Sequence, residues 1–365
     1  MNQQRRGVIC YAHRGARGHA PENTLLAFDL AFDLGSDGIE CDVQRSRDGE
    51  LVIIHDGTVN RTTNGVGAVA ALTSADLRAL DAGYQWRIPQ RIPTLAETLD
   101  LVRQREGALN LEVKGETVDE AIGTAEAVEP VLRALEEPLR ARLLVSSFAH
   151  PAVARLKERL PWLRVAALYS GREWQKRDML APALAMGTEA IHPGVGLTTA
   201  ELIAQAHAQG LRVNVWTANR RATIRRLLAW GVDGLFSDYP ERVIIARAQM
   251  AAQMAAQTIY NTLSNDAHEA CQIGHERRGS QERGAVSLCR HLADDLADAL
   301  AVGAALRFLR GERHHLAEIP AVLLDEMGND GANLVVGQPR REVCGQNLRL
   351  ALFLLGQFGA ITLAE

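Results

Sequence analysis

Residues 37–56 read DGIECDVQRSRDGELVIIHD, and this segment combines the pattern of a buried β-strand with charged groups. Apolar residues alternate with acids in its first half, so Glu40 and Asp42 share one face of the strand. Asp48-Gly49 then has the composition of a hairpin turn, and the apolar run that follows ends in His55. The segment predicts a strand, a tight turn and a return strand, with two carboxylates on one side.

Short apolar runs recur over residues 8–238, and segments with helical periodicity separate them. Eight runs have the length of buried strands: VICYA (8–12), IECDV (39–43), LNLEV (109–113), LLVSS (143–147), VAALY (165–169), AIHP (190–193), VNVWT (213–217) and GLFSD (234–238). Eight strands that alternate with helices predict an α/β fold, a (β/α)8 TIM barrel. The return strand LVIIH (51–55) is an addition after the second barrel strand.

The length of the chain predicts a second segment beyond the barrel. A barrel of this class needs about 250 residues, whereas the chain has 365. We expect a barrel domain at 7–247, with a lid-like insertion at 57–93 over its mouth, and a C-terminal extension at 248–365. The composition changes near residue 250, because all five Trp and every Lys precede it.

The C-terminal extension, 248–365, is expected to be partly helical, with helices over 248–263 and 292–310. We identify no family resemblance in it, and the sequence assigns it no function. Three interpretations stay open: an accessory interaction segment, a poorly ordered extension, or a reading-frame artefact. Beyond residue 250 there are 10 Arg and 14 Asp or Glu, so this segment carries the whole net charge of −4.

Charge and apolar patterning argue against several classes of partner. Without a basic face, we expect neither nucleic acid nor an anionic membrane surface as a partner. No apolar segment has the length of a signal peptide or a membrane span, so we expect a cytoplasmic protein with no integral membrane association. The five Cys are scattered without CxxC spacing, as expected for reduced thiols. The oligomeric state stays open.

Helix starts support the alternation of strands and helices. Thr94-x-x-Glu97 and Thr198-x-x-Glu201 match the capping box, in which a threonine side chain accepts a bond from the backbone three residues later. The weakest helix is expected over 173–184, because Pro182 interrupts it.

Four short motifs place charged residues at the carboxyl ends of strands, where the active sites of TIM barrels form. They are His13-Arg14-Gly15, Glu40-x-Asp42, His55-Asp56 and Glu112-x-Lys114. Two histidines suit a pair in which one accepts a proton while the other donates one. Arg14 and Lys114 can neutralise the anionic oxygens of a phosphodiester. Together, these motifs predict a site that cleaves phosphodiesters.

Three carboxylates, those of Glu40, Asp42 and Glu112, are the candidate metal ligands. A single Glu-x-Asp on a strand is more often part of a surface ion-pair ladder. Here apolar residues flank both acids in a strand that a barrel buries on both sides, so the carboxylates need a cation or strong donors. Oxygen ligands favour one divalent cation, Mg²⁺ or Ca²⁺, over zinc.

Other candidates have simpler interpretations beside the functional one. Trp216, at the end of the seventh strand, is a candidate for lining the mouth against the substrate, and a core role is the alternative. Glu22 and Asn23, in the PENT motif, are interpreted as residues of a helix start. Four further strand-end residues are held as supporting groups: Ser146, Ser147, His192 and Asp238.

The sequence resembles the glycerophosphodiester phosphodiesterase family, and specifically its short bacterial cytoplasmic branch. The resemblance covers about residues 7–247, and its blocks include AHRGARGHAPENTLLAF (12–28), RTTNGVG (61–67), LNLEVKG (109–115) and GVDGLFSDYP (231–240). It implies a barrel enzyme that hydrolyses glycerophosphodiesters, such as glycerophosphocholine or glycerophosphoethanolamine, to sn-glycerol 3-phosphate and an alcohol.

The resemblance also implies a role for each motif residue. His13 is similar to the family's proton acceptor and His55 to its proton donor. Glu40, Asp42 and Glu112 are similar to the metal ligands. Arg14 and Lys114 are similar to the residues that contact the substrate phosphate.

Two other functions stay open on the sequence. A phospholipase of the sphingomyelinase D type shares the barrel and the two-histidine, acidic site, although such enzymes are usually secreted and disulfide-bonded. A non-catalytic barrel that binds phosphodiesters is the second. Neither the preferred head group nor the choice between water and a glycerol hydroxyl as first nucleophile follows from the sequence.

Overall fold

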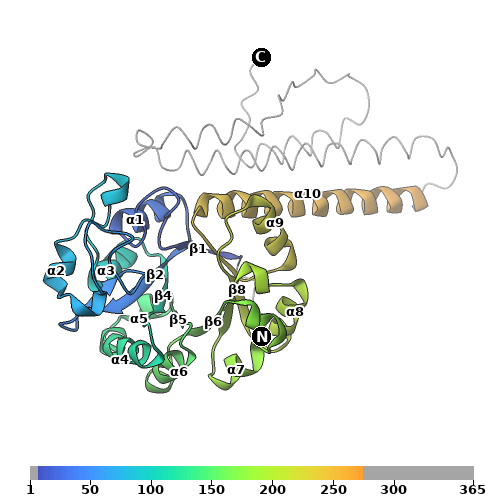
Figure 1. Cartoon of the computed structure of the whole chain (residues 1–365). Coiled ribbons are helices and arrows are strands. Elements are labelled where there is room, and N and C mark those ends of the chain that lie inside the picture. The colour runs from blue at the N-terminus through green and yellow to red at the C-terminus, as the bar shows by residue number, and fades with distance from the viewer. Residues whose placement is uncertain (1–6, 274–365) are drawn as a thin grey trace, which may run out of the picture. The chain divides into compact units, whose positions relative to one another are not determined.

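A closed barrel of eight parallel strands forms the centre of the protein in the computed structural model, which describes residues 7–273. The strands follow the order β1-β9-β8-β7-β6-β5-β4-β2, and pairing of β1 with β2 closes the ring. Figure 1 shows helices outside this ring. The barrel strands are β1 (Ile9–His13), β2 (Gly38–Arg45), β4 (Ala108–Val113), β5 (Leu143–Ser147), β6 (Val165–Tyr169), β7 (Ala190–Pro193), β8 (Arg212–Val215) and β9 (Gly234–Ser237). The predicted TIM barrel is confirmed.

Strand register brings the predicted acids together. β2 and β4 pair so that Asp42 lies opposite Glu112. β1 pairs with β2 so that His13 lies opposite Glu40. Parallel strands in register hold neighbouring side chains of one face close to each other. The backbone alone therefore places three acids and a histidine on adjacent strands.

The hairpin after β2 follows the prediction in its turn and differs in its length. β3 (Leu51–Ile53) pairs antiparallel with the end of β2, and Gly49 has a φ of +88° in the turn between them. Because of this pairing, β2 continues to Arg45. The prediction that Asp42 ends its strand is therefore wrong, since the return strand extends β2 by three residues.

Helices follow the strands and cover the outside of the barrel (Figure 1). They are α1 (Leu25–Asp33), α3 (Leu95–Gln104), α4 (Val118–Arg133), α5 (Glu137–Arg140), α6 (His150–Arg159), α7 (Leu180–Ala185), α8 (Ala200–Ala208) and α9 (Arg221–Trp230). The short 3-10 turns η3 (Arg172–Lys176) and η4 (Val195–Leu197) precede α7 and α8.

The expected helix over 173–184 is divided into η3 and α7. Pro182 lies in the first turn of α7, where its missing N–H removes no helical hydrogen bond. Thr94 forms the predicted capping box with Glu97 at the start of α3. The prediction for α8 is wrong by one residue, since Thr199 caps this helix.

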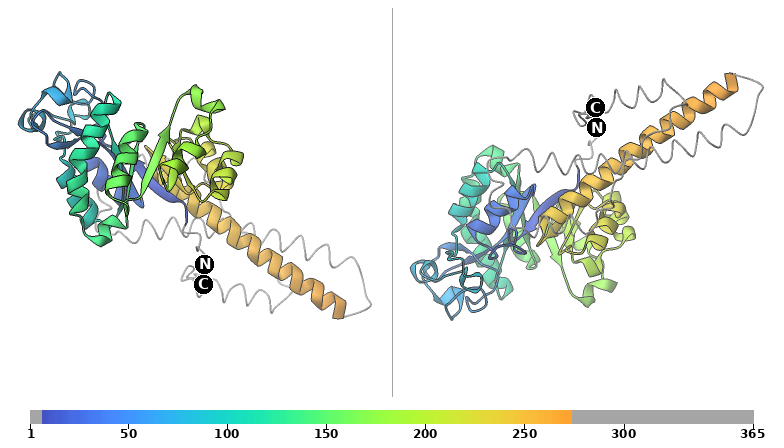
Figure 2. Two further views of the ribbon diagram at one scale, coloured as in Figure 1. Left: turned by 90° about the horizontal axis from the view of Figure 1, so that it is seen from below. Right: turned by 90° about the horizontal axis from the view of Figure 1, so that it is seen from above.

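The insertion over 57–93 folds as a small unit beside β3. It contains η1 (Val69–Ala71), α2 (Ser74–Arg78) and η2 (Tyr84–Trp86). Its apolar side chains form a separate cluster with residues of β3 and the segment after it: Val52, Ile54, Val59, Val69, Leu77, Ala82 and Ile92. Figures 1 and 2 place α2 on the side of the barrel away from α8. That the insertion acts as a lid stays a prediction.

The last described helix is α10 (Pro240–Ile273), which includes the helix expected over 248–263. By its internal contacts the chain divides after Arg247 into two units, 1–247 and 248–365. The helix expected over 292–310 lies outside the described residues. Within residues 7–273, no helix combines the length and the apolar character that a membrane span requires.

Candidate active site

One pocket in the barrel collects most of the residues that the sequence singles out. It encloses about 360 Å³, including its open side. It is lined by His13, Arg14, Glu40, His55, Asn110, Glu112, Phe148, Leu168, His192, Trp216 and Phe236. Asp42 and Lys114 belong to the same group through contacts with these residues. The structure thus brings together the seven motif residues that have a predicted catalytic, metal-binding or phosphate-binding role, and Trp216 lines the pocket with them.

His13 is the last residue of β1, and Asp238, one residue past β9, holds its ring. The Nδ1 atom of His13 lies 2.7 Å from Oδ1 of Asp238. Asn219 fixes Asp238 in turn, because its side-chain amide donates to Oδ2 at 2.7 Å. Burial lowers the pKa of His13, and the bond to Asp238 opposes this shift. The contact leaves Nε2 of His13 as the nitrogen available to a substrate.

A tight turn after β1 directs Arg14 into the pocket. Arg14 has a φ of +58° and Gly15 a φ of +78°, and a Cβ atom on Gly15 would lie 2.6 Å from the backbone of Ala27. Only glycine fits there. The backbone N–H of Arg14 donates to Oε2 of Glu40 at 2.8 Å, and its guanidinium donates to Glu22 at 2.8 Å.

Glu40, Asp42 and Glu112 form the candidate metal centre. Each of the three offers an oxygen, and these oxygens lie within 4.8 Å of one another. Among the described residues, Oε1 of Glu40 and Oδ1 of Asp42 are buried and have no hydrogen-bond partner. Buried carboxylate oxygens without donors are unfavourable unless a cation is bound. The donor set therefore fits a hard divalent cation.

The protonation of this cluster is uneven. Burial raises the pKa of Glu40 well above its usual range, and the neighbouring charges of Asp42 and Glu112 raise it further. Burial also raises the pKa of Glu112. Burial acts in the same direction on Asp42, yet Lys114 and Arg14 hold its pKa at about 2. The charged groups of the protein thus only partly compensate the three buried carboxylates.

Lys114 follows β4 directly and lies beside the acids. Its Nζ atom donates to Oε1 of Glu112 at 2.8 Å and lies 3.5 Å from Oδ1 of Asp42. The two carboxylates raise the pKa of Lys114 against the effect of burial, so the ammonium stays charged. Its charge is available to an anionic oxygen bound in the pocket.

His55 lies two residues beyond β3 and is held by an ionic network. Its Nδ1 atom lies 2.6 Å from Oδ1 of Asp56. Arg61, from the insertion, donates to Oδ2 of Asp56 at 2.6 Å and to both oxygens of Glu22 at 2.7 and 2.9 Å. Burial lowers the pKa of His55, while Asp42 and Asp56 oppose this effect. Through Arg61 the insertion thereby contacts Asp56 and Glu22, which border the pocket residues His55 and Arg14.

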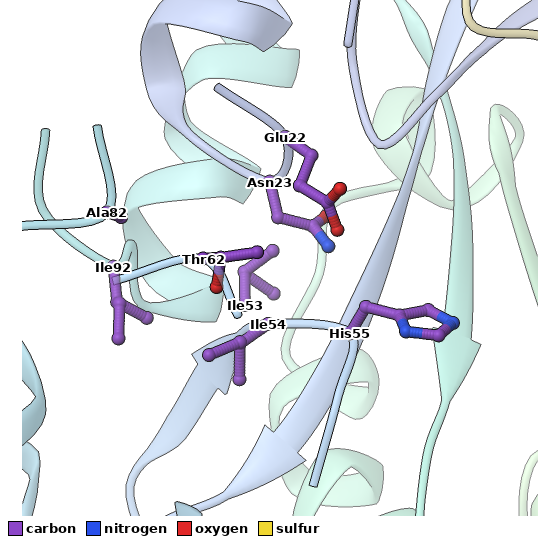
Figure 3. Close-up of a pocket in the computed structure, with 8 residues that line it drawn as sticks. All are labelled: Glu22, Asn23, Ile53, Ile54, His55, Thr62, Ala82 and Ile92. Atoms are coloured by element: carbon purple, nitrogen blue, oxygen red, sulfur yellow. The ribbon is translucent and has the colours of Figure 1, made fainter. Parts of the chain in front are cut away.

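A smaller side pocket of about 220 Å³ lies next to His55. Figure 3 shows its lining: Glu22, Asn23, Ile53, Ile54, His55, Thr62, Ala82 and Ile92. In this view the His55 ring points away from Ile54 and Ile92. Successive residues of an extended chain point to opposite sides, so the insertion packs on one side and the imidazole faces the barrel on the other.

Trp216 comes directly after β8 and is fixed at both ends. Its Nε1 atom donates to the carbonyl of His192 at 2.8 Å. Its ring meets Phe148 edge to face, with 5.5 Å between centroids. The side chain lines the pocket, which agrees with the sequence interpretation, and its contact with a substrate stays a prediction.

Several contacts of the site are missed by sequence reasoning. Thr24 caps α1, so the expected helix-start role does not belong to Glu22 or Asn23. Glu22 joins the two arginines instead, and the amide of Asn23 donates to Oδ2 of Asp42 at 2.8 Å. The available signal is the position of PENT at a strand-to-helix turn, at the end of the barrel that carries the pocket.

Asp238→Asn tests the role of the His13 contact. We expect kcat to fall by about 10²-fold or more. An asparagine amide can donate to Nδ1 and thereby select the tautomer in which Nε2 carries the proton, and this nitrogen can then no longer accept one. The carboxylate raises the pKa of His13, so its loss lowers that pKa and moves the acid limb of the kcat/KM profile to lower pH. An unchanged pH profile with full kcat would contradict this role.

Comparison with known proteins shows which family the chain resembles. The model of the glycerophosphoryl diester phosphodiesterase family matches residues 13–242. A glycerophosphodiester phosphodiesterase of Caldanaerobacter subterraneus is 37% identical over 242 residues, which are 65% of this chain and 96% of that protein. One from Bacillus altitudinis is 36% identical over 244 residues, 66% of this chain and 98% of that protein.

A solved structure supports the same assignment. The phosphodiesterase of Oleispira antarctica, determined in complex with the product sn-glycerol-3-phosphate, is 33% identical to this chain with a TM-score of 0.59. The alignment covers 66% of this chain and 96% of that one. The family match runs from His13, at the end of β1, to the start of α10. The chain therefore belongs to the glycerophosphoryl diester phosphodiesterase family.

Proposed function

We propose that this chain hydrolyses glycerophosphodiesters, such as glycerophosphocholine and glycerophosphoethanolamine, to sn-glycerol 3-phosphate and an alcohol with the help of one divalent cation. The observation that carries the proposal is the meeting of two histidines and three buried carboxylates around one pocket. Family membership supports the same reaction class. The names of the relatives and the product bound in the Oleispira enzyme agree with it.

His13 is the proposed proton acceptor. Asp238 fixes its Nδ1, so Nε2 can accept a proton from the attacking oxygen, either of water or of a glycerol hydroxyl. Burial lowers the pKa of His13, which keeps the imidazole neutral and ready to accept that proton. A neutral base near the phosphorus is what the first step requires.

His55 is the proposed proton donor to the departing oxygen. Burial lowers the pKa of His55, and the charge of Asp42 and the contact with Asp56 partly oppose this shift. When the bond between phosphorus and the departing oxygen breaks, transfer of a proton from His55 avoids the release of a free alkoxide. In this step His13 thus acts as the base and His55 as the acid.

Glu40, Asp42 and Glu112 would hold the cation, Mg²⁺ or Ca²⁺. A bound divalent cation would supply charge stabilisation for the phosphoryl oxygens in the transition state. Arg14 and Lys114 would contact these oxygens from the protein side, and their guanidinium and ammonium groups already lie against the acids. Trp216 would pack on the substrate at the pocket wall.

A substrate panel separates this function from its two rivals. We expect release of sn-glycerol 3-phosphate from glycerophosphocholine and glycerophosphoethanolamine when Mg²⁺ or Ca²⁺ is present. Dominant release of choline from lysolipid or sphingomyelin would favour a sphingomyelinase D-like phospholipase. Binding of glycerophosphodiesters without turnover would favour a non-catalytic barrel.

The barrel domain, 7–247, is proposed to carry this activity alone. Arg247 donates to the carbonyl of Val8 at 2.7 Å and pairs with Asp37, so a chain that ends at residue 248 keeps this contact. We expect the truncated chain to retain kcat/KM within about twofold, since the site residues all precede the cut. Loss of turnover in a truncated chain with a normal thermal transition would show that the extension contributes to the site.

A further inference from the structure

Part of the wall of the barrel pocket is not used by the proposed chemistry. Five residues there are neither acids nor catalytic histidines: Asn110, Phe148, Leu168, His192 and Phe236. Ala166 precedes Leu168 by two residues on β6, and Ala190 precedes His192 by two residues on β7, so each pair shares the inward face. Ala166 and Ala190 pack with Leu144 in a buried cluster. This buried cluster lies toward the amino ends of the strands, whereas the reactive groups lie toward their carboxyl ends.

His192 lines the pocket and has one ring nitrogen without a hydrogen-bond partner among the described residues. The residue is fully buried, and its Nε2 atom lies 2.9 Å from the side-chain nitrogen of Asn214. An amide nitrogen only donates, so Nε2 accepts and the proton of the neutral ring lies on Nδ1. Among the described residues Nδ1 has no hydrogen-bond partner. Burial lowers the pKa of His192 to about 3, so the ring stays neutral at physiological pH.

Asn110 presents an unpaired acceptor to the same pocket. Its side-chain nitrogen donates to Oγ of Ser146 at 2.9 Å, which directs the amide and leaves Oδ1 without a partner in the described part of the chain. Buried polar atoms are rarely left unpaired, and two of them at one pocket indicate a polar ligand. A hydroxyl group both donates and accepts, so it is the simplest group that satisfies such a wall.

The identity of the hydroxyl follows from the chemistry of the substrate. In glycerophosphocholine the only hydroxyl groups belong to glycerol, since the choline end carries none. The hydroxyl farthest from phosphorus reaches deepest when the phosphate lies at the reactive groups. The aromatic side chains of Phe148 and Phe236 give the carbon chain an apolar wall.

We propose that Nδ1–H of His192 donates a hydrogen bond to the terminal hydroxyl of the substrate's glycerol moiety and makes the pocket selective for the glycerol side of the diester. This inference rests on the proposed hydrolysis of glycerophosphodiesters. It assigns His192 to substrate recognition, away from the proton transfers of His13 and His55. The variable head group would then lie toward the open side of the pocket.

Two substrates measure this contact directly. Glycerophosphocholine is compared with the phosphocholine diester of propane-1,2-diol, which lacks the terminal hydroxyl and keeps the middle one, so either nucleophile remains possible. The wild-type protein should prefer glycerophosphocholine by about 10- to 100-fold in kcat/KM, because the deoxy substrate leaves a buried donor unpaired. Equal use of both would overturn the inference, and a water molecule would then satisfy Nδ1.

Two matched variants separate recognition from a structural role. His192→Asn keeps a polar atom near the position of Nδ1, whereas His192→Gln keeps one near Nε2. We expect His192→Asn to retain most of the preference and His192→Gln to lose it, through a lower kcat/KM for glycerophosphocholine alone. An equal loss on both substrates in both variants would overturn the inference, because it would indicate a structural role or a contact with the phosphate.

The same measurement distinguishes failure of the proposed function from failure of the role of His192. If the wild-type protein with Mg²⁺ or Ca²⁺ turns over neither diester, the proposed function fails and the inference fails with it. If it turns over both diesters at the same rate, the proposed function stands and only the role of His192 is overturned. The two results are read from one pair of progress curves.

Discussion

His13→Ala is expected to reduce kcat for glycerophosphocholine by about 10³-fold or more. The imidazole lies in the pocket with its Nδ1 held by Asp238, and its Nε2 is the proposed proton acceptor. Alanine removes the base and leaves the metal ligands in place. Initial rates of sn-glycerol 3-phosphate release, measured at saturating substrate, give the result.

A second histidine provides the control for this variant. His207 pairs with Asp233 at 2.8 Å on the surface and takes no part in the pocket. His207→Ala should keep kcat within about twofold of the wild type. Full activity in His13→Ala would contradict the role assigned to the residue.

Removal of the cation is the second large effect that we expect. Dialysis against a chelator should abolish turnover, and addition of Mg²⁺ or Ca²⁺ should restore it, because without a cation the three carboxylates repel the anionic phosphoryl oxygens. Titration of the metal-free protein with each ion, with initial rates as the readout, also shows which of the two is used. Undiminished turnover in chelator would contradict the metal centre.

Glu40→Gln tests the same centre by stability. Without a cation, the folded state raises the pKa of Glu40, so the metal-free protein should lose stability as the pH rises above the ordinary value of 4.5. Glutamine removes this unfavourable charge, and we expect it to stabilise the metal-free protein at pH 7 by about 1–2 kcal/mol while turnover is lost. Thermal unfolding in chelator measures the first effect. A destabilised variant would contradict the electrostatic account.

Much of the fold could be predicted from the sequence because it depends on local patterns. Each predicted barrel strand appears in the structure, since a run of apolar residues bounded by helices has few other places in a protein of this length. The motif acids converge because strand register brings Asp42 beside Glu112. Alternation along a strand is therefore enough to predict which side chains share the barrel interior.

The rest depends on contacts between residues far apart in the sequence. Asp238 and His13 are 225 positions apart, and no periodicity relates them. Arg61 reaches Glu22 across 39 positions only because the insertion folds back toward the segment before α1. The predicted cap of α8 is wrong by one residue because Thr198 and Thr199 carry the same hydroxyl group. The hydroxyl of Thr199 caps the helix, and that of Thr198 donates to the carbonyl of Gly194 instead.

The bond that is broken tests the central claim most directly. Phosphorus NMR of the full-length protein with glycerophosphocholine and Mg²⁺ or Ca²⁺ distinguishes the two products that cleavage of the diester can give. We predict sn-glycerol 3-phosphate as the phosphorus-containing product, formed only while the cation is present. Formation of phosphocholine, or an unchanged diester with either cation, would contradict the account.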